Sequence, residues 1–156
     1  MSRYDDVVNR FSATTVGSWL VKHVASRLDP LIFKATKGRF TSTGRPTLPM
    51  LALTVPGRHS GEPRTVQLAY VADGDDYLVV ASAMGQERHP AWRYNLEAAE
   101  TATIQLRGQV QTVEATVLAD DDKAEYWPRI EEAIPQMRTY LTRTDRNIRV
   151  FRLSPM

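Results

Sequence analysis

The stretch LPMLALTVPGRHSGEPRTVQLAYVAD, residues 48–73, decides the fold of this chain. Its two ends, 48–55 and 63–72, are rich in Val and Leu and predict two neighbouring strands. A hairpin commonly needs only about two to five connecting residues. This connection is longer and carries arginines, a histidine, a serine and two glycines. Reversing the chain does not require that chemistry, so the loop is a candidate binding segment.

Further strands follow the same pattern of short apolar runs between turn residues. The sequence DGDD predicts a turn into a third strand at 77–83, and a second hairpin is expected over 101–106 and 109–118. The run at 148–155 predicts the last strand. Six antiparallel strands with few helices favour a mainly β fold with added helices, a closed or half-closed barrel, over a βαβ sheet.

Three helices are expected outside these strands. Residues 15–28 place apolar side chains on one helical face, and a second helix is expected from Pro90 onward. The third, 120–134, begins with acidic residues that suit a helix start, and Pro128 is a candidate kink within it. No linker interrupts the chain. We therefore predict a single domain over 1–156, with a helical and loop extension over 1–46 and the barrel core over 47–156.

The composition is that of a globular protein, with 42% apolar and 24% charged residues. The chain has no cysteine, which excludes disulfides and thiolate chemistry, and its net charge of +2 is too small to argue for nucleic acid. Charged residues fall where a signal peptide would be apolar, and no run of about 18 apolar residues suggests a membrane span. These features are consistent with a cytoplasmic protein.

Basic charge is concentrated at the front, where residues 1–45 carry eight Lys and Arg against three Asp. The helix expected at 15–28, with Trp19, Lys22 and Arg27, can rest on the anionic inner face of the cell membrane. The alternative is a helix that covers the barrel. The sequence leaves both interpretations open, and it leaves the oligomeric state open as well.

Two segments carry the candidate binding chemistry. In the loop at 58–64, the backbone near the glycines, the Ser60 hydroxyl and two guanidinium groups can converge on a phosphate. In ASAMGQERHPAW, 81–92, a loop leads from a strand into a helix start, where N–H groups favour anions and Trp92 can cover a flat heterocycle. The alternatives are a solvated hairpin and a tryptophan that anchors the core.

Other kinds of site have little support in the sequence. The three histidines show no metal-binding spacing, so no metal is expected, and no GxSxG motif supports a serine hydrolase. The segment 125–148 carries several aromatic residues and Met137. It is interpreted either as an apolar wall beside a planar substrate or as a helix packed on the barrel.

Taken together, LTVPGRHSGEPRTVQLAYVADGDDYLVVASAMGQERHPAWRYNL at 53–96 and the later EYWPRIEEAIP and TYLTRTDRNI resemble the deazaflavin-dependent nitroreductase and quinone reductase family of actinobacteria. The resemblance covers about residues 48–155. It rests on the Gly-Arg-His-Ser-Gly-Glu-Pro-Arg loop, the strand that ends in Ala-Ser, the Pro-Ala-Trp helix start with a following Asn-Leu, and the Thr-Asp-Arg near the end. The order and spacing of these motifs are specific.

The resemblance implies a split β-barrel that binds reduced coenzyme F420, a 5-deazaflavin with a phosphate and a polyglutamate tail. It also implies hydride transfer from this cofactor to quinones, activated alkenes or nitroaromatic compounds. The cofactor-binding residues that it implies are Arg58, His59, Ser60, Gly61, Pro63, Arg64, Ser82, Ala83, Met84, Arg88, Pro90, Ala91 and Trp92. The substrate-pocket residues that it implies are Trp19, Tyr126, Ile134, Met137 and Tyr140.

Departures from the family pattern narrow the expected activity. His59 and Ala83 stand where nitroreductase members often have lysine. Of the tyrosines on the substrate side only Tyr140 remains, with Ile134 and Met137 at the other positions. We therefore predict an F420H2-dependent reductase of quinones, enones or related electron-poor compounds, and we do not expect nitro reduction.

A proton must follow the hydride in such a reaction. Tyr140, Ser82 and solvent are the candidate donors, and Tyr140 and Ser82 are the two predicted catalytic residues. One alternative function is non-catalytic binding of a deazaflavin or flavin on the same barrel. A conventional FMN oxidoreductase on a related barrel is the other.

Overall fold

The computed structural model describes Ala35 and residues 48–156. The predictions for the helix at 15–28 and for Trp19 lie outside these residues. The chain divides by its internal contacts into two units, Met1–Thr47 and Leu48–Met156, and the second contains the barrel. That the whole chain acts as one domain stays a prediction.

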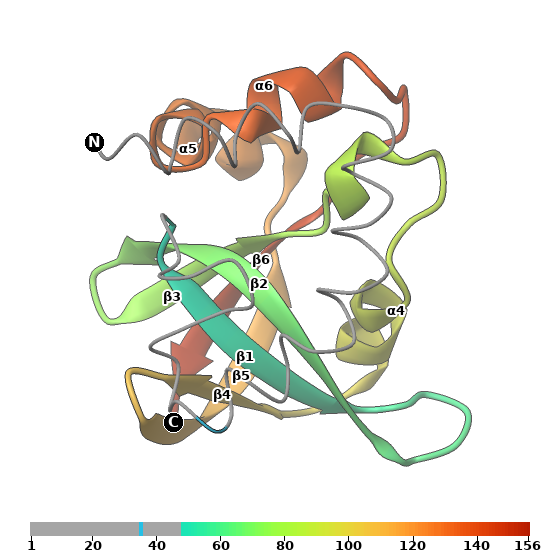
Figure 1. Ribbon diagram of the computed structural model, residues 1–156, viewed down its shortest axis with the longest axis vertical. Coiled ribbons are helices and arrows are strands. Elements are labelled where there is room, and N and C mark those ends of the chain that lie inside the picture. The colour runs from blue at the N-terminus through green and yellow to red at the C-terminus, as the bar shows by residue number, and fades with distance from the viewer. Residues whose placement is uncertain (1–34, 36–47) are drawn as a thin grey trace. The chain divides into compact units, whose positions relative to one another are not determined.

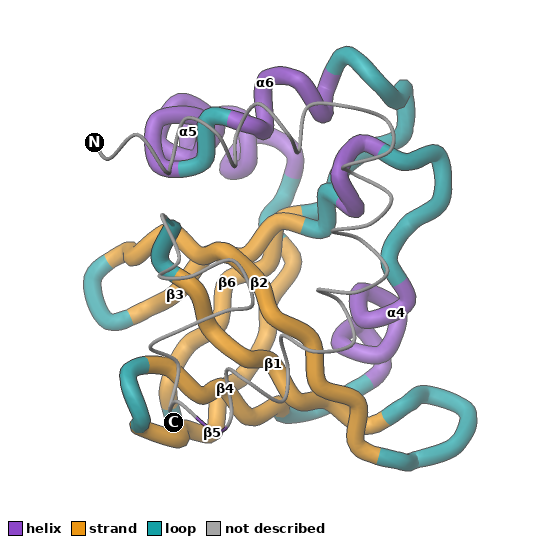
Figure 2. The backbone as a smooth tube through the Cα atoms, viewed as in Figure 1, coloured by secondary structure: helices purple, strands orange, loops and turns teal. Residues whose placement is uncertain are grey.

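Six antiparallel strands close into a barrel (Figures 1 and 2). They are β1 Met50–Pro56, β2 Pro63–Asp73, β3 Asp76–Val80, β4 Ala102–Leu106, β5 Gln109–Val117 and β6 Val150–Pro155. Their order is β1-β2-β3-β6-β5-β4, and β4 pairs with β1 to close the ring. Leu53, for example, lies opposite Val66 on one side and Ile104 on the other. The predicted six-stranded antiparallel barrel is confirmed.

The interior of the barrel is one hydrophobic core. Leu51, Leu53 and Val55 of β1 are fully buried, because alternate residues of a strand point to the same face. They pack in one cluster with Ile104 and Phe151. Burial of such a side chain stabilises the fold by about 1.5–3 kcal/mol.

A second core lies outside the barrel, where helices α5 Asp120–Ala133 and α6 Gln136–Leu141 cover the outer face of β2, β3 and β6 (Figure 1). The buried members of this outer core are Val71, Leu78, Val80, Leu118, Ile130, Ile134, Met137, Ile148 and Val150. The third described helix, α4 Ala91–Ala98, contacts β1 and β5 and buries Leu96. No helix of the described residues has the length and hydropathy needed to cross a membrane.

The predicted bounds differ from the structure at two points that concern the site. The third strand ends at Val80 and not at 83, because Ala83 and Met84 adopt φ of 46° and 55°, which a strand does not allow. Helix α4 begins at Ala91, and Pro90 precedes it with an extended backbone. The strand end and the helix start are therefore joined by a tight turn and a short loop.

The segment after α5 also differs from the prediction. Pro128 lies inside α5, which continues over 14 residues. The helix ends at Ala133, because φ of −131° and ψ of 78° at the following Ile134 leave the helical region. A separate helix, α6, then begins after Pro135. The sequence did not predict this second helix as a separate element.

Candidate active site

The β1–β2 loop is held by hydrogen bonds within itself. The Gly57 N–H donates to the Glu62 carbonyl oxygen at 2.8 Å, and the Gly61 N–H donates to the Gly57 carbonyl oxygen at 2.7 Å. The Glu62 N–H donates to the Ser60 hydroxyl oxygen at 3.2 Å. The amides suggested by the sequence as anion donors are thus engaged inside the loop, and its side chains remain available to a ligand.

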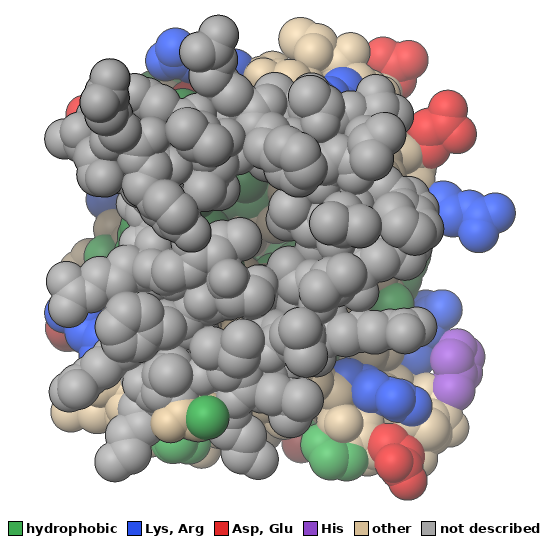
Figure 3. Space-filling model, viewed as in Figure 1, with side chains coloured by type: hydrophobic (Ala, Val, Ile, Leu, Met, Phe, Trp, Pro, Cys, Tyr) green, Lys and Arg blue, Asp and Glu red, His purple; other side chains and the backbone are tan. Residues whose placement is uncertain are grey.

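Helix α4 anchors this loop from the side. The Arg58 N–H donates to Asn95 Oδ1 at 3.1 Å, and the Arg58 guanidinium lies 4.7 Å from the centre of the Tyr94 ring. His59, Ser60 and Arg64 are exposed. Within the described part of the chain, Arg58 and Arg64 form no ion pair with a carboxylate. The loop therefore presents two guanidinium groups that form no ion pair with a described carboxylate, and Figure 3 shows basic side chains at the edge of the molecule where this loop projects.

The second predicted segment makes a left-handed turn after β3. Ala83, Met84 and Gly85 have φ of 46°, 55° and 74° in succession. The Gly85 N–H donates to the Ser82 carbonyl oxygen at 3.0 Å, and the Gln86 N–H donates to the Ala83 carbonyl oxygen at 3.1 Å. Non-glycine residues in this region are strained by about 1–3 kcal/mol each, and such strain persists only where the surroundings impose it.

Arg146 supplies those surroundings. Its Nε donates to the Gln86 carbonyl oxygen at 2.7 Å, and its Nη1 donates to the Ala81 carbonyl oxygen at 2.9 Å. Its Nη2 donates to the Ser82 carbonyl oxygen. Sequence reasoning missed this residue as part of the site. The signal was present, because Arg146 is the arginine of the Thr-Asp-Arg motif, to which no role was assigned.

His89 joins the same group of side chains. Its Nδ1 lies 3.1 Å from Arg146 Nη1, and its ring meets the Tyr94 ring edge-on with centres 6.1 Å apart. Burial lowers the pKa of His89, and the nearby charges of Arg93 and Arg146 lower it further. The imidazole is therefore neutral at pH 7, and Nδ1 accepts the arginine hydrogen bond.

Tyr140 lies beside the left-handed turn. Helix α6 contacts the short 3-10 turn Ala83–Gly85, and Gly85 packs on the Tyr140 backbone. Burial raises the pKa of the Tyr140 phenol, with an opposing effect from Arg143. Two exposed apolar side chains, Met84 and Leu141, stand on the same two elements. The structure thus brings together the two predicted catalytic segments, the one with Ser82 and the one with Tyr140.

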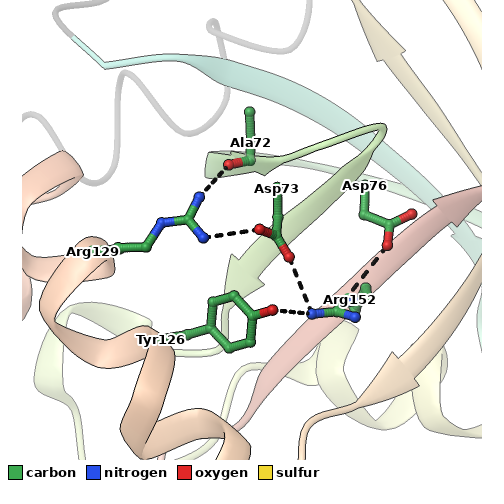
Figure 4. A network of polar contacts seen from close by, with 6 residues as sticks. All are labelled: Ala72, Asp73, Asp76, Tyr126, Arg129 and Arg152. Atoms are coloured by element: carbon green, nitrogen blue, oxygen red, sulfur yellow. Dashed lines mark hydrogen bonds and ion pairs between the residues drawn. The ribbon is translucent and has the colours of Figure 1, made fainter.

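The other described substrate-pocket predictions belong to the outer core or pack against it, as Tyr140 itself does. Ile134 and Met137 are 2% and 5% exposed and belong to the outer core. The Tyr126 hydroxyl lies 2.7 Å from Arg152 Nη2, in a polar network that also contains Asp73 (Figure 4). Of the four described members of the predicted pocket, Tyr140 is the one whose backbone packs on Gly85.

The remaining cofactor-binding predictions fall on the segment between the turn and α4 and on the adjoining strand. Arg88 and Ala91 are exposed, and Pro90 is half-buried. Trp92 is half-buried and packs on Phe151 with ring centres 5.7 Å apart, so it anchors α4 on the barrel core. Pro63 is exposed at the start of β2.

An anionic planar cofactor fits these residues. Five arginines on or near the two segments have no carboxylate partner among residues 48–156. They are Arg58 and Arg64 of the loop, Arg88 before α4, and Arg146 and Arg149 before β6. Met84, with 47% of its surface exposed, adds apolar surface for a ring. A hollow of about 740 Å³ beside the β2–β3 turn and the chain end contains none of the predicted site residues. The described residues contain no group of three or more His, Asp or Glu able to hold a metal.

Comparison with known proteins identifies the family of this chain. The model of the F420H(2)-dependent quinone reductase family matches residues 25–155. An F420H(2)-dependent quinone reductase of Mycobacterium tuberculosis (strain H37Rv) is 35% identical over 141 residues, covering 86% of this chain and 95% of the relative. A solved F420-H2 dependent reductase, FDR-A, is 34% identical with a TM-score of 0.63, covering 68% of this chain and 94% of that one.

A second solved structure, described as a domain-swapped dimer, is 29% identical with a TM-score of 0.65 and covers 80% of this chain and 95% of that one. The barrel is thus the fold of both similar structures, and the residues matched by the family model include both candidate segments and Arg146. The chain belongs to the F420H(2)-dependent quinone reductase family.

Proposed function

We propose that this protein transfers hydride from reduced coenzyme F420 to a quinone, and that it also accepts enones and related electron-poor compounds. The family is F420H2-dependent, and its members are oxidoreductases. The observation that carries the proposal is that the β1–β2 loop, with Arg58 and Arg64, and residues 81–89, with Arg146 bound against them, meet on Tyr94 of α4 through Arg58 and His89. Such a surface suits an anionic planar cofactor better than a neutral one.

The site residues divide into those that bind the anionic side of the cofactor and those that hold its ring system. We assign Arg58, His59, Ser60 and Arg64 to the anionic side of the cofactor, since their side chains are exposed on the loop. We assign the turn at 82–84 and the start of α4 to its ring system. The cofactor supplies the hydride, and the protein's part is to hold two planar molecules in contact and to exclude water from between them.

Affinity and turnover together test the proposal. Purified full-length protein is titrated with F420 and, separately, with FMN, while the tryptophan fluorescence is followed. Reduction of menadione and of cyclohexenone by F420H2 is then measured. Micromolar quenching by F420, weak or no quenching by FMN, and turnover of menadione support the proposal. Binding of FMN alone would assign the barrel to flavin, and F420 binding without turnover would make the protein a carrier.

We also propose a cytoplasmic location with contact to the inner face of the cell membrane, where quinones reside. The support is the sequence, since residues 1–45 are strongly basic and contain Trp19. Flotation of the full-length protein with anionic vesicles tests it, with a Lys22→Gln and Arg27→Gln double variant as the comparison. Protein that stays at the bottom of the gradient in both forms contradicts membrane contact.

A further inference from the structure

Among the described residues, all polar partners of the Arg146 side chain lie on one short segment, residues 81–89. The guanidinium donates to three backbone carbonyl oxygens, those of Ala81, Ser82 and Gln86, and to the His89 ring. These partners lie about 60 positions earlier in the chain, and the connection between α6 and β6 carries Arg146 past the turn (Figure 1). One side chain thus ties the beginning, the middle and the end of the segment together.

The bonding pattern requires a guanidinium. Its five N–H donors lie in one plane on three nitrogen atoms, and four of them are used here. A lysine ammonium carries its three donors on one atom and cannot reach four acceptors spread along a segment. Arg146 has no carboxylate partner among residues 48–156, so the cation is not present to form an ion pair.

The hydrogen bonds from Arg146 to the backbone carbonyl oxygens fix the direction of the neighbouring N–H groups. No peptide bond of the described residues is cis, so the N–H of each peptide unit points away from its own C=O. Because the carbonyl oxygens of Ala81 and Ser82 face Arg146, the N–H groups of Ser82 and Ala83 face the other way. The positive charge behind the carbonyls polarises both peptide units and strengthens these N–H groups as donors.

The bond to His89 fixes a second donor. Nδ1 accepts from Arg146, so the proton of the neutral ring is on Nε2. Arg93 and Arg149 also face this ring and Glu97 lies near it, and burial with the arginine charges keeps the ring pKa low. Arg146 therefore sets both the backbone direction of the turn and the tautomer of the histidine that follows it.

We infer that Arg146 is a positioning residue for hydride transfer: it holds residues 81–89 in the conformation that receives the ring system of the cofactor. This inference rests on the proposed function. Arg146 acts through the segment and does not itself touch the reacting atoms. Without it the strained φ angles at 83 and 84 relax, and the cofactor ring loses a fixed surface to lie on.

The test compares two arginine-to-lysine variants. Arg146→Lys removes the planar donor set, whereas Arg129→Lys removes bonds to a carboxylate and a carbonyl elsewhere, those of Asp73 and Ala72. For each variant the Kd for F420, the kcat and KM for F420H2 with menadione, and the thermal midpoint are measured. The ring ¹⁵N shifts of His89 report its tautomer.

We expect Arg146→Lys to raise Kd and KM for F420H2 at least tenfold, with mixed tautomers at His89. Arg129→Lys should lower the thermal midpoint and leave Kd and KM within twofold. If Arg146→Lys also leaves Kd and KM within twofold of the wild-type values while the wild type is active, this inference fails and the proposed function stands. A wild type that neither binds F420 nor reduces menadione marks failure of the proposed function instead.

A milder pair of variants decides the question if Arg146→Lys does not fold. His89→Leu removes one acceptor of Arg146, and His89→Gln offers an amide oxygen in its place. A rise of threefold or more in KM for His89→Leu, rescued by His89→Gln, supports the positioning role. An unchanged KM in both variants overturns it.

Discussion

Gly85 packs directly on the backbone of Tyr140, which joins the turn after β3 to helix α6. A Cβ atom added at position 85 would lie 2.9 Å from the Tyr140 carbonyl oxygen and 3.0 Å from its Cα. Contacts this short with backbone atoms cannot be relieved by a side-chain rotation. The left-handed φ of 74° at Gly85 adds a second demand for glycine at the same position.

Gly85→Ala should therefore lower stability and separate the turn from α6. We expect a loss of about 2–4 kcal/mol, since backbone strain and overpacking each cost about 1–3 kcal/mol. Chemical denaturation measures the loss. The control is Gly74→Ala, because Gly74 has φ of 63° but nothing lies within 4 Å of the added Cβ. Equal losses in the two variants would show that φ alone, and not contact with Tyr140, requires glycine at 85.

Tyr140→Phe tests the proton donor. Burial raises the pKa of this phenol above its usual value of 10.0, so the hydroxyl is protonated and able to donate throughout the neutral range. A general acid contributes about a hundredfold or more to a rate. We expect kcat for menadione to fall by about that factor while Kd for F420 stays constant. If kcat falls in Ser82→Ala and stays normal in Tyr140→Phe, the serine and not the tyrosine is the proton donor.

The sequence predicted most of the fold because local patterns specify it. Alternation and turn residues were enough for six strands, with errors of one to three residues at most ends. The third strand was predicted too long, because nothing in Ala-Ser-Ala-Met indicates that Ala83 and Met84 adopt positive φ. That conformation depends on Arg146, which lies far along the chain.

The site was predicted less completely, for the same reason. The motifs identified the two candidate segments, but the residues that hold them, Asn95 and Arg146, had been noticed only as parts of motifs. The resemblance assigned Ile134 and Met137 to a pocket, and the structure buries both in the outer core; that they line a substrate pocket stays a prediction. Long-range contacts decide these roles.

Asn95→Ala should loosen the β1–β2 loop without unfolding the barrel. The Asn95 side chain accepts the Arg58 N–H, and the loss of this hydrogen bond costs about 0.5–1.5 kcal/mol. We expect faster amide hydrogen exchange at residues 58–61 and weaker F420 binding, with strand protection unchanged. Asn147→Ala is the matched control, because that amide binds Asp120 at the start of α5 instead. Equal exchange at 58–61 in the wild type and Asn95→Ala would contradict the anchoring role.

Asp73 should make the attachment of α5 to the barrel sensitive to acid. Its carboxylate oxygens accept from Arg129 at 2.8 Å and from Arg152 at 3.1 Å (Figure 4). The hydrogen bond from Arg129 is the main cause that holds the pKa of Asp73 below 3.8, against the effect of burial. A carboxyl group whose pKa is lowered by folding binds fewer protons in the folded state. Its stabilising contribution is therefore present above pH 3.8 and is lost as the pH falls through the folded-state pKa.

Asp73→Asn should remove this contribution at neutral pH. We expect a loss of about 1–2 kcal/mol in the free energy of unfolding, which is modest because Arg129 is half exposed. The loss should shrink as the pH is lowered below 3.8 toward the folded-state pKa, where the wild-type carboxylate is itself becoming protonated. Urea unfolding at several pH values measures it, with the exposed neighbour Asp75→Asn as control. A difference between wild type and Asp73→Asn that stays constant with pH would mean that the amide disturbs packing, and that the ion pairs do not stabilise the helix.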